Sequence, residues 1–146
     1  MINMQKSERF LVLDYETFSE HDLKKSGAFE YAAHESTEIL CAGFAIGTKD
    51  ELKKAPVKLW SPLPEFREEY GHNFGELLNA LCDESITIVA HNSLFEQVIT
   101  RFVFGKKYMY SRSYLQKIPI ERWHCTASLA RSVAIPGKLE GAGAAL

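Results

Sequence analysis

Residues 9–16 of the chain read RFLVLDYE, an apolar run that ends in the acidic residues Asp14 and Glu16. A short continuous apolar run indicates a buried strand, so we predict a strand over residues 9–14 that presents Asp14 at its C-terminal end. Alternate residues of a strand point the same way, which places the two carboxylates side by side. Such an oxygen-rich pair suits Mg²⁺ or Mn²⁺. By itself, however, the pair is more typical of a strand end that meets solvent with two unrelated acids.

A second polar group follows another short apolar segment, residues 85–90 (SITIVA), which we also predict to be a strand. The chain then continues into a helix that Ser93 is expected to cap, with Asn92 at the turn and Glu96 on the first helical turn. Ligands of open α/β sheets collect outside the C-terminal ends of strands, so we expect both acidic groups to meet at one edge of the sheet. The alternative is that Glu96 only favours the positive N-terminus of its helix.

The remaining pattern predicts a single α/β domain, 1–146, with a mixed sheet. Strand-like segments precede a part of the chain in which strands and helices alternate, and no internal repeat or linker interrupts it. We expect further strands at 38–47, 56–60 and 123–125, of which the second lies near an edge of the sheet because Pro56 opens it. Helices are expected at 74–82 and 126–134, and a helical pattern begins in the tail at 138. A polar connection with a helical piece near 22–25 is expected at 19–37, and loops at 61–73 and 105–121.

Composition narrows the class of protein. The 146 residues carry a net charge of −2 and are 46% hydrophobic, which is ordinary for a globular domain. No run of 18 apolar residues and no apolar signal core occurs, so we expect no membrane partner and a cytoplasmic location. The three cysteines form no CxxC pair, which favours free thiols. The slightly negative charge argues against a large surface for duplex DNA, although not against a small site that grips a strand end through bound cations.

The two acidic motifs together resemble a known family. LDYETFSE (13–20) and VAHNSLFEQVI (89–99) are similar to the first two motifs of the DnaQ-like (DEDD) 3′–5′ exonucleases. With the segments at 21–47 and 123–140, the chain resembles the N-terminal proofreading domain of phage-type family A DNA polymerases over about residues 9–146. The resemblance implies an RNase H-like fold, a mixed sheet flanked by helices. It also implies two divalent cations, Mg²⁺ (or Mn²⁺), and hydrolysis of phosphodiester bonds at a single-stranded DNA 3′ end.

The resemblance assigns roles by position. Asp14 would bind both metals, and Glu16 would bind the metal that holds the attacking water. Glu96 matches the acid of the second motif, which is more often Asp in the superfamily, so the metal distance or preference is open. The catalytic and metal positions are therefore Asp14, Glu16 and Glu96, and the substrate-binding positions implied are Thr17, Asn92 and Phe95.

One family motif has no counterpart in the chain. The third motif of the family is a Tyr or His followed a few residues later by Asp, and the chain has no such pair at a suitable place. One metal ligand and the general base that the resemblance implies are therefore lacking. The fold is in this sense C-terminally incomplete, and we expect weak or no nuclease activity from the chain alone. Three explanations remain open: a fragment, a partner polypeptide such as a polymerase domain acting in cis or trans, or lost catalysis. An inactive nucleic-acid-binding or polymerase-contact module and a hydrolase acting on RNA are the competing functions.

Some further residues invite a functional reading. The segment 105–117 interleaves basic residues with tyrosines, which suits stacking of single-stranded nucleic acid on Tyr108 or Tyr110, although a solvated loop is the more ordinary explanation. His91 is more often structural than a ligand at such a strand end. The remaining aromatic set reads as core: Phe44, Phe74, Phe102 and Phe104.

Overall fold

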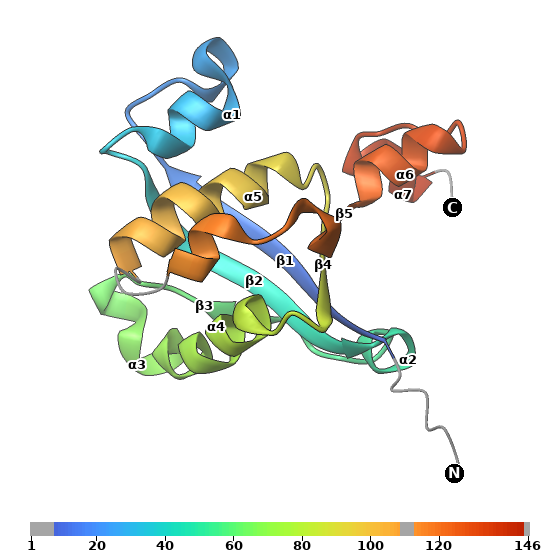
Figure 1. Cartoon of the computed structure of the whole chain (residues 1–146), viewed down its shortest axis with the longest axis horizontal. Helices are drawn as coiled ribbons and strands as arrows, with labels where there is room; N and C mark the ends of the chain where they lie inside the picture. The colour runs from blue at the N-terminus through green and yellow to red at the C-terminus, as the bar shows by residue number, and fades with distance from the viewer. Residues whose placement is uncertain (1–7, 109–112, 145–146) are drawn as a thin grey trace.

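The computed structural model of the protein describes residues 8–108 and 113–144. A five-stranded mixed sheet forms its centre, in the order β3-β2-β1-β4-β5 (Figure 1). β1 is antiparallel to β2 and parallel to β4, while β5 is parallel to β4. The predicted α/β class and mixed sheet are thereby confirmed, and the short β3 lies at an edge as expected. The strands are β1 (Arg9–Phe18), β2 (Glu38–Thr48), β3 (Lys58–Trp60), β4 (Ile86–Ala90) and β5 (Trp123–Cys125).

β1 is longer than the sequence predicted. It pairs with β2 through Phe18, but with β4 only as far as Val12. Asp14 and Glu16 therefore lie inside the strand and not at its end, which corrects our prediction. The reason is that β2 continues the antiparallel ladder beyond the acids, and the alternating burial of β1 extends to Tyr15, whereas the continuous apolar run of the sequence stops at Leu13. What ends near the acids is the parallel pairing with β4.

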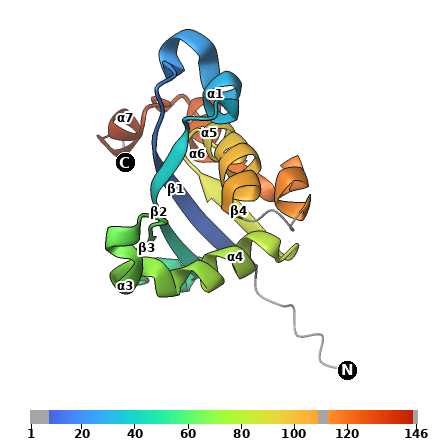
Figure 2. The same ribbon diagram turned by 90° about the vertical axis from the view of Figure 1, so that its left-hand side faces the viewer.

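One face of the sheet is covered by helices, as Figures 1 and 2 show. α4 (Phe74–Cys82) begins and ends as predicted, and α5 (Leu94–Ile99) continues directly into a π-helical segment, η3 (Thr100–Tyr108). Part of the predicted loop at 105–121 is thus helical, because the apolar residues of η3 are needed in the core. The core-facing side chains of β1 pack under these helices: Leu11, Leu13 and Tyr15. An aromatic cluster closes the core: Trp60, Phe74, Phe104 and Tyr108.

The connection between β1 and β2 is also more ordered than predicted. α1 (Leu23–Ala33) fills most of it, and the Asp22 side chain accepts a hydrogen bond from the backbone N–H of Lys24 at 2.9 Å. The helix is kinked at Gly27, whose φ of 81° lies in the left-handed region that glycine adopts without steric cost. The glycine that marked this stretch as a connection in the sequence is therefore the kink within a helix.

Several short helical turns occupy segments that we predicted to be loops. The proline-rich stretch after β3 contains η1 (Pro64–Phe66), α3 (Arg67–Tyr70) and η2 (Gly71–Asn73), and α2 (Lys49–Leu52) follows β2. After η3 come η4 (Ser113–Lys117) and η5 (Ile120–Arg122). Prolines and a glycine mark several of these turns: η1 begins at Pro64, η2 begins at Gly71, and η5 follows Pro119.

Buried Arg122 ties η5 to the sheet and to α4. Its guanidinium donates hydrogen bonds to the backbone carbonyls of Ala80 and Leu81, at the end of α4, and of Ile86 at the start of β4. A cation at the C-terminal end of a helix satisfies carbonyls that have no helical partner. Arg122 thus fixes the position of β4, the strand that leads into the second motif.

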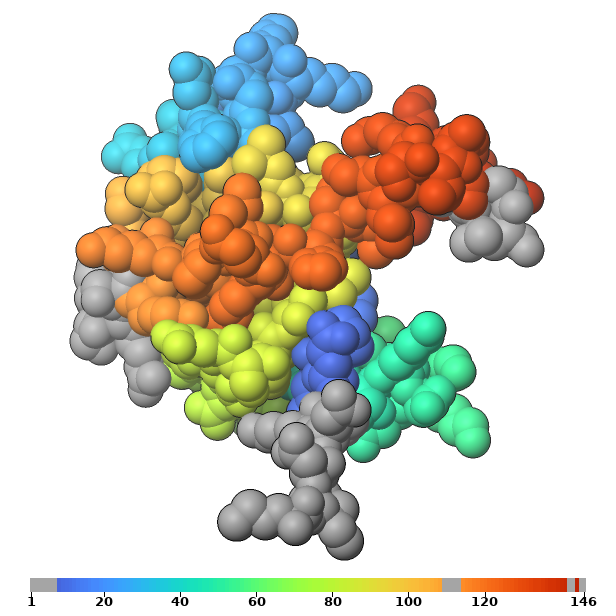
Figure 3. Space-filling model, turned by 45° about the vertical axis from the view of Figure 1, so that its right-hand side comes forward, coloured from blue at the N-terminus to red at the C-terminus, as the bar shows by residue number. Residues whose placement is uncertain are grey.

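The last two helices form a projecting lobe. α6 (Thr126–Ser132) starts where predicted but ends two residues before the predicted end at Ala134. Ala134 has a left-handed φ of 61°. α7 (Leu139–Ala144) packs beside α6. Figure 3 shows this lobe, in red, standing away from the rest of the molecule. No helix in the described part of the chain is long and apolar enough to cross a membrane.

Candidate active site

The candidate site lies where β1 and β4 part. The two strands are paired only as far as Val12 and Val89, so the rest of β1 has no strand on that side. β4 ends at Ala90, and the chain turns into α5, which packs against β1 instead. The free edge of β1 presents backbone groups that need partners. This geometry brings the second sequence motif beside the middle of the first (Figure 1).

Glu96 is the buried acid of this site. The residue is 3% exposed, and its Oε2 atom has no hydrogen-bond partner among the described residues. Burial raises the pKa of Glu96 to about 7, and the negative charges of Asp14 and Cys125 add to the rise. The backbone N–H groups of Glu96 itself and of Tyr15 oppose it by favouring the carboxylate. A buried carboxylate oxygen without a partner is costly, so this side chain is ready to accept a proton or a cation.

Asp14 and Glu16, in contrast, are exposed. Both lie on the face of β1 opposite to the buried Leu13 and Tyr15, so the prediction that they share one face is confirmed. Cys41 lies directly across from Glu16 in the ladder with β2. Burial raises the pKa of the Cys41 thiol, and the charges of Glu16 and Asp14 raise it further. The two carboxylates thus make this face of the sheet locally negative.

The three acids meet only in part. One carboxylate oxygen of Glu96 has no hydrogen-bond partner among the described residues, and the charge of Asp14 repels that of Glu96. Both observations fit a cation-binding role, because one cation would offset both negative charges. Over residues 8–108 and 113–144, however, no group of three or more His, Cys, Asp or Glu side chains is arranged to hold a metal ion. The assignment of Asp14, Glu16 and Glu96 as ligands of two Mg²⁺ (or Mn²⁺) ions therefore stays a prediction.

Asn92 occupies the sharp turn between β4 and α5. Its φ of 62° is left-handed, a conformation that Asn tolerates better than most residues other than Gly. Its carbonyl accepts the backbone N–H of Phe95 at 3.1 Å, which closes the turn. An exposed residue held in such a conformation is typical of functional sites, where strain keeps a side chain in place. The conformation leaves the Asn92 side chain free to contact a ligand.

A hollow of about 390 Å³ lies next to this turn, between α1 and the start of α5; we call it the α1–α5 hollow. Three of the predicted site residues line it, namely Asn92, Phe95 and Glu96. Leu23 and Ala28 of α1 form the opposite wall, which sequence reasoning did not identify because the extent of α1 was not foreseen. Asp14, Glu16 and Thr17 do not line it. Its walls are apolar on the α1 side and polar at the turn.

Thr17 is held in place by a contact with Tyr31 of α1. Its hydroxyl lies 2.9 Å from the hydroxyl of Tyr31, and the Tyr31 ring packs on Phe95 with ring centroids 6.0 Å apart. The ladder between β1 and β2 shifts register between Glu16 and Thr17, an irregularity of the kind often found beside active sites. Tyr31 thus links a residue of the first motif to one of the second. No sequence pattern indicated this link.

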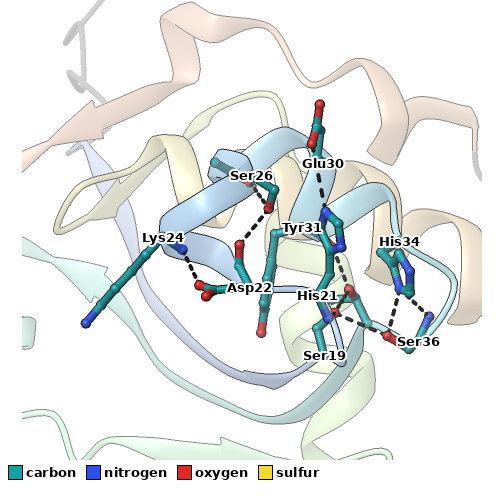
Figure 4. Close-up of polar contacts among 11 residues, drawn as sticks. Ser19, His21, Asp22, Lys24, Ser26, Glu30, Tyr31, His34 and Ser36 are labelled. Atoms are coloured by element: carbon teal, nitrogen blue, oxygen red, sulfur yellow. Dashed lines mark hydrogen bonds and ion pairs between the residues drawn. The ribbon is translucent and has the colours of Figure 1, made fainter.

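The base of α1 carries a polar network that the sequence did not reveal (Figure 4). The imidazoles of His21 and His34 are stacked with centroids 4.8 Å apart, although the two residues lack metal-ligand spacing. Nε2 of His21 lies 3.8 Å from a carboxylate oxygen of Glu30, and Nδ1 of His34 lies 2.7 Å from the hydroxyl of Ser36. The Ser36 hydroxyl also accepts a backbone N–H from Glu20. This network anchors α1 to the loop before β2.

Cys125 adds a further anionic group. Burial alone would raise the pKa of its thiol, but hydrogen bonds from Ser128 and Ser93, through both side chains and backbone, outweigh burial and lower the pKa to about 6. Cys125 also lies near enough to Glu96 for its charge to contribute to the raised pKa of that acid. We had assigned Cys125 no role. Ser128 is a local neighbour in the first turn of α6, whereas Ser93 approaches Cys125 only through folding.

The neighbouring polar residues of the second motif are structural. His91 uses both ring nitrogens, with Nε2 2.9 Å from the carbonyl of Gly137 and Nδ1 2.8 Å from the hydroxyl of Thr126. Its structural interpretation is confirmed. Ser93 does not cap α5 as predicted: it is buried, already has helical dihedrals, and accepts a hydrogen bond from Gln97.

The proposed stacking role of Tyr108 is not supported. Its ring packs edge-on against Trp60 and Phe104, with centroid distances of 5.8 and 6.4 Å. Burial raises the pKa of its hydroxyl. Tyr108 is thus part of the aromatic core, and Tyr110 lies outside the described residues. Phe44 and Phe104 are fully buried, which confirms the core prediction for these two, whereas Phe74 and Phe102 are partly buried and pack against the core.

Comparisons of structure define the class of fold. The chain superposes on exonuclease I in an ExoI/SSB-Ct complex with a TM-score of 0.58 and 13% identity, covering 93% of this chain and 34% of that one. It also matches a zinc-bound E. coli ExoI–ssDNA complex with a TM-score of 0.56 and 13% identity, over 88% of this chain and 30% of that one. The chain therefore has the RNase H-like fold of the DnaQ-like exonucleases, as its motifs predicted.

Comparison of sequence points to a particular relative. The chain is 30% identical over 136 residues to a DNA polymerase of Bacillus phage SP02, which confirms the predicted resemblance to a phage polymerase. The match covers 93% of this chain but spans only 18% of the polymerase. No model of a protein family matches the chain.

Proposed function

We propose that the chain is a metal-dependent 3′–5′ exonuclease domain associated with a DNA polymerase, acting on a single-stranded DNA 3′ end. The observation that carries the proposal is the buried carboxylate of Glu96, whose Oε2 atom has no hydrogen-bond partner among the described residues and whose pKa the charge of Asp14 raises. Most buried polar atoms in proteins have a hydrogen-bond partner, so an oxygen without one calls for a functional explanation. The exonuclease I fold and the similarity to a phage polymerase support the same function.

Each site residue then has a definite task. Asp14, Glu16 and Glu96 would hold divalent cations, which would supply a hydroxide from bound water and stabilise the leaving 3′ oxygen. The α1–α5 hollow would receive the terminal nucleoside, with Phe95 as an apolar wall and the amide of Asn92 at its mouth. Thr17, held by Tyr31, would position the nucleotide relative to the two exposed acids. No side-chain nucleophile is required.

A proofreading role in a polymerase and a partner polymerase domain, in cis or in trans, follow from the same proposal. The absent third motif predicts that the chain alone hydrolyses DNA weakly or not at all. The second candidate function is an inactive nucleic-acid-binding or polymerase-contact module. It is favoured by the lack of a ready three-ligand cluster within the described residues.

Metal binding and hydrolysis together test the proposal. Titration of the chain with Mn²⁺, followed by calorimetry, should show binding that Glu96→Gln and Asp14→Asn each weaken at least tenfold, while Glu76→Gln, an exposed acid on α4, leaves it unchanged. Residual release of 5′-mononucleotides from single-stranded DNA in Mn²⁺ should disappear in the same two variants. Mn²⁺ binding that survives both substitutions would contradict the proposal and leave the inactive module.

A further inference from the structure

We infer that a groove between α1, α5 and η4 binds the body of a single DNA strand whose 3′ end lies in the α1–α5 hollow. This inference rests on the proposed function and extends it from the terminal nucleotide to the nucleotides that precede it. The groove has a volume of about 270 Å³. Figure 3 shows the three segments that form it one above another on the same face: α1 in blue, α5 in yellow and η4 in orange.

The groove carries unpaired positive charge. Arg101 and Lys117 line it, and no acidic residue does. Among the described residues, neither side chain forms an ion pair, and the same holds for Lys106 nearby. The chain as a whole has a net charge of −2, so this patch is a local region of positive charge, which attracts phosphates. Two cations without acidic partners suit the sugar-phosphate backbone of a nucleic acid.

An apolar surface lies beside these cations. Phe29 is 54% exposed and lines the groove, and its ring meets that of Phe102 edge-on with centroids 6.4 Å apart. The guanidinium of Arg101 lies 5.0 Å from the centre of the Phe102 ring, and Lys106 Nζ lies 5.3 Å from it. Rings flanked by cations are the usual combination in sites for single strands, where bases stack while phosphates are neutralised.

The groove adjoins the α1–α5 hollow. Leu94 lines both, and it is 47% exposed although it is a large apolar residue at the start of α5. A strand whose terminal nucleoside occupies the hollow would therefore cross Leu94 and place its next phosphates near Arg101. We expect single-stranded DNA to bind in preference to duplex DNA, because only unpaired bases can stack on the exposed ring of Phe29.

Equilibrium binding tests the inference without requiring catalysis. Fluorescence anisotropy in EDTA would compare oligo-dT of about 2 and about 12 nucleotides, at several salt concentrations, because only the longer strand extends past the α1–α5 hollow to Arg101. We expect Arg101→Gln and Lys117→Gln each to weaken binding of the longer strand about fivefold, to spare the shorter one, and to reduce the salt slope by about 0.7. Phe29→Ala should weaken the longer strand about tenfold. Lys53→Gln, an exposed lysine that directly follows α2, is the control of equal charge change.

The outcomes separate this inference from the proposed function. If Lys53→Gln weakens binding as much as Arg101→Gln, or if both lengths respond alike, attraction is non-specific and the groove is not the site. An RNA strand that binds more tightly than DNA of equal length would overturn the choice of DNA. The proposed function fails independently, if Mn²⁺ binding does not depend on Glu96 while the longer strand still binds through Arg101. Thermal denaturation confirms that each variant is folded.

Discussion

The two halves of the acid site differ in their contact with water. Asp14 and Glu16 are exposed on the open face of β1, where solvent screens their charges. Glu96 is buried against the other side of the same strand, and one of its oxygens has no partner. This difference means that the exposed acids and the buried acid affect the stability of the fold unequally. The exposed pair supplies charge at little cost to stability, whereas the buried acid stores an unfavourable interaction that a proton or a cation relieves.

The largest expected effect is a dependence of stability on pH. The pKa of Glu96 is raised to about 7 from its usual 4.5, so the folded chain binds more protons than the unfolded chain between these values. Stability must then fall as pH rises through this window, by about 3 kcal/mol if Glu96 titrates alone. Urea denaturation in chelator between pH 4.5 and 8 measures it. Subtracting the same profile of Glu96→Gln removes the contributions of all other groups, and identical profiles would contradict the contrast drawn above.

A neutral replacement of each acid sharpens the comparison further. At pH 8 Glu96→Gln should stabilise the chain by about 2 kcal/mol, because it removes a buried charge and keeps the shape of the side chain. Glu16→Gln, on the exposed face, should change stability by less than about 0.5 kcal/mol. Chemical denaturation in chelator measures both. Equal effects would show that the two acids share one environment.

Several strands of the sheet and the helix α4 were predictable from the sequence. Apolar runs located β2 and β4, and the spacing of Leu77, Leu78 and Leu81 located α4. Those signals are local, since each depends on residues within one element. Of the three predicted acids, Asp14 lies near enough to Glu96 for its charge to raise the pKa of that side chain. The convergence of all three on one metal site stays a prediction.

The burial of Glu96 was not predictable in the same way. It depends on β4 leaving β1 at Val12, so that α5 crosses the free edge of the strand. Likewise, Tyr108 enters the core and Cys125 meets Ser93 only through contacts between distant segments. A sequence pattern reports the polarity of a residue. It does not report which long-range partner removes that residue from water.

Cys125 offers a chemical probe of the buried side of the site. Its pKa is lowered to about 6, against the raised pKa of Cys41 on the exposed side, so iodoacetamide at pH 7 should modify Cys125 about tenfold faster. Mass spectrometry of peptides gives both rates in one sample. Ser128→Ala should slow Cys125 alone, because it removes one of the hydrogen bonds that favour the thiolate. Comparable rates at the two thiols would mean that these bonds do not form in solution.

The smallest expected effect concerns the contact that joins the two halves of the site. Tyr31→Phe removes the hydroxyl that lies 2.9 Å from Thr17, and should cost about 1 kcal/mol of stability, the typical worth of such a hydrogen bond. Thr17→Val removes the other partner. If the contact exists, the double variant loses no more than about the larger single loss, giving a coupling near 1 kcal/mol in urea denaturation. Additive losses would instead mean that each hydroxyl acts through water, and that α1 does not position the exposed acids. Tyr70→Phe, on α3 away from the site, controls for loss of a tyrosine hydroxyl in general.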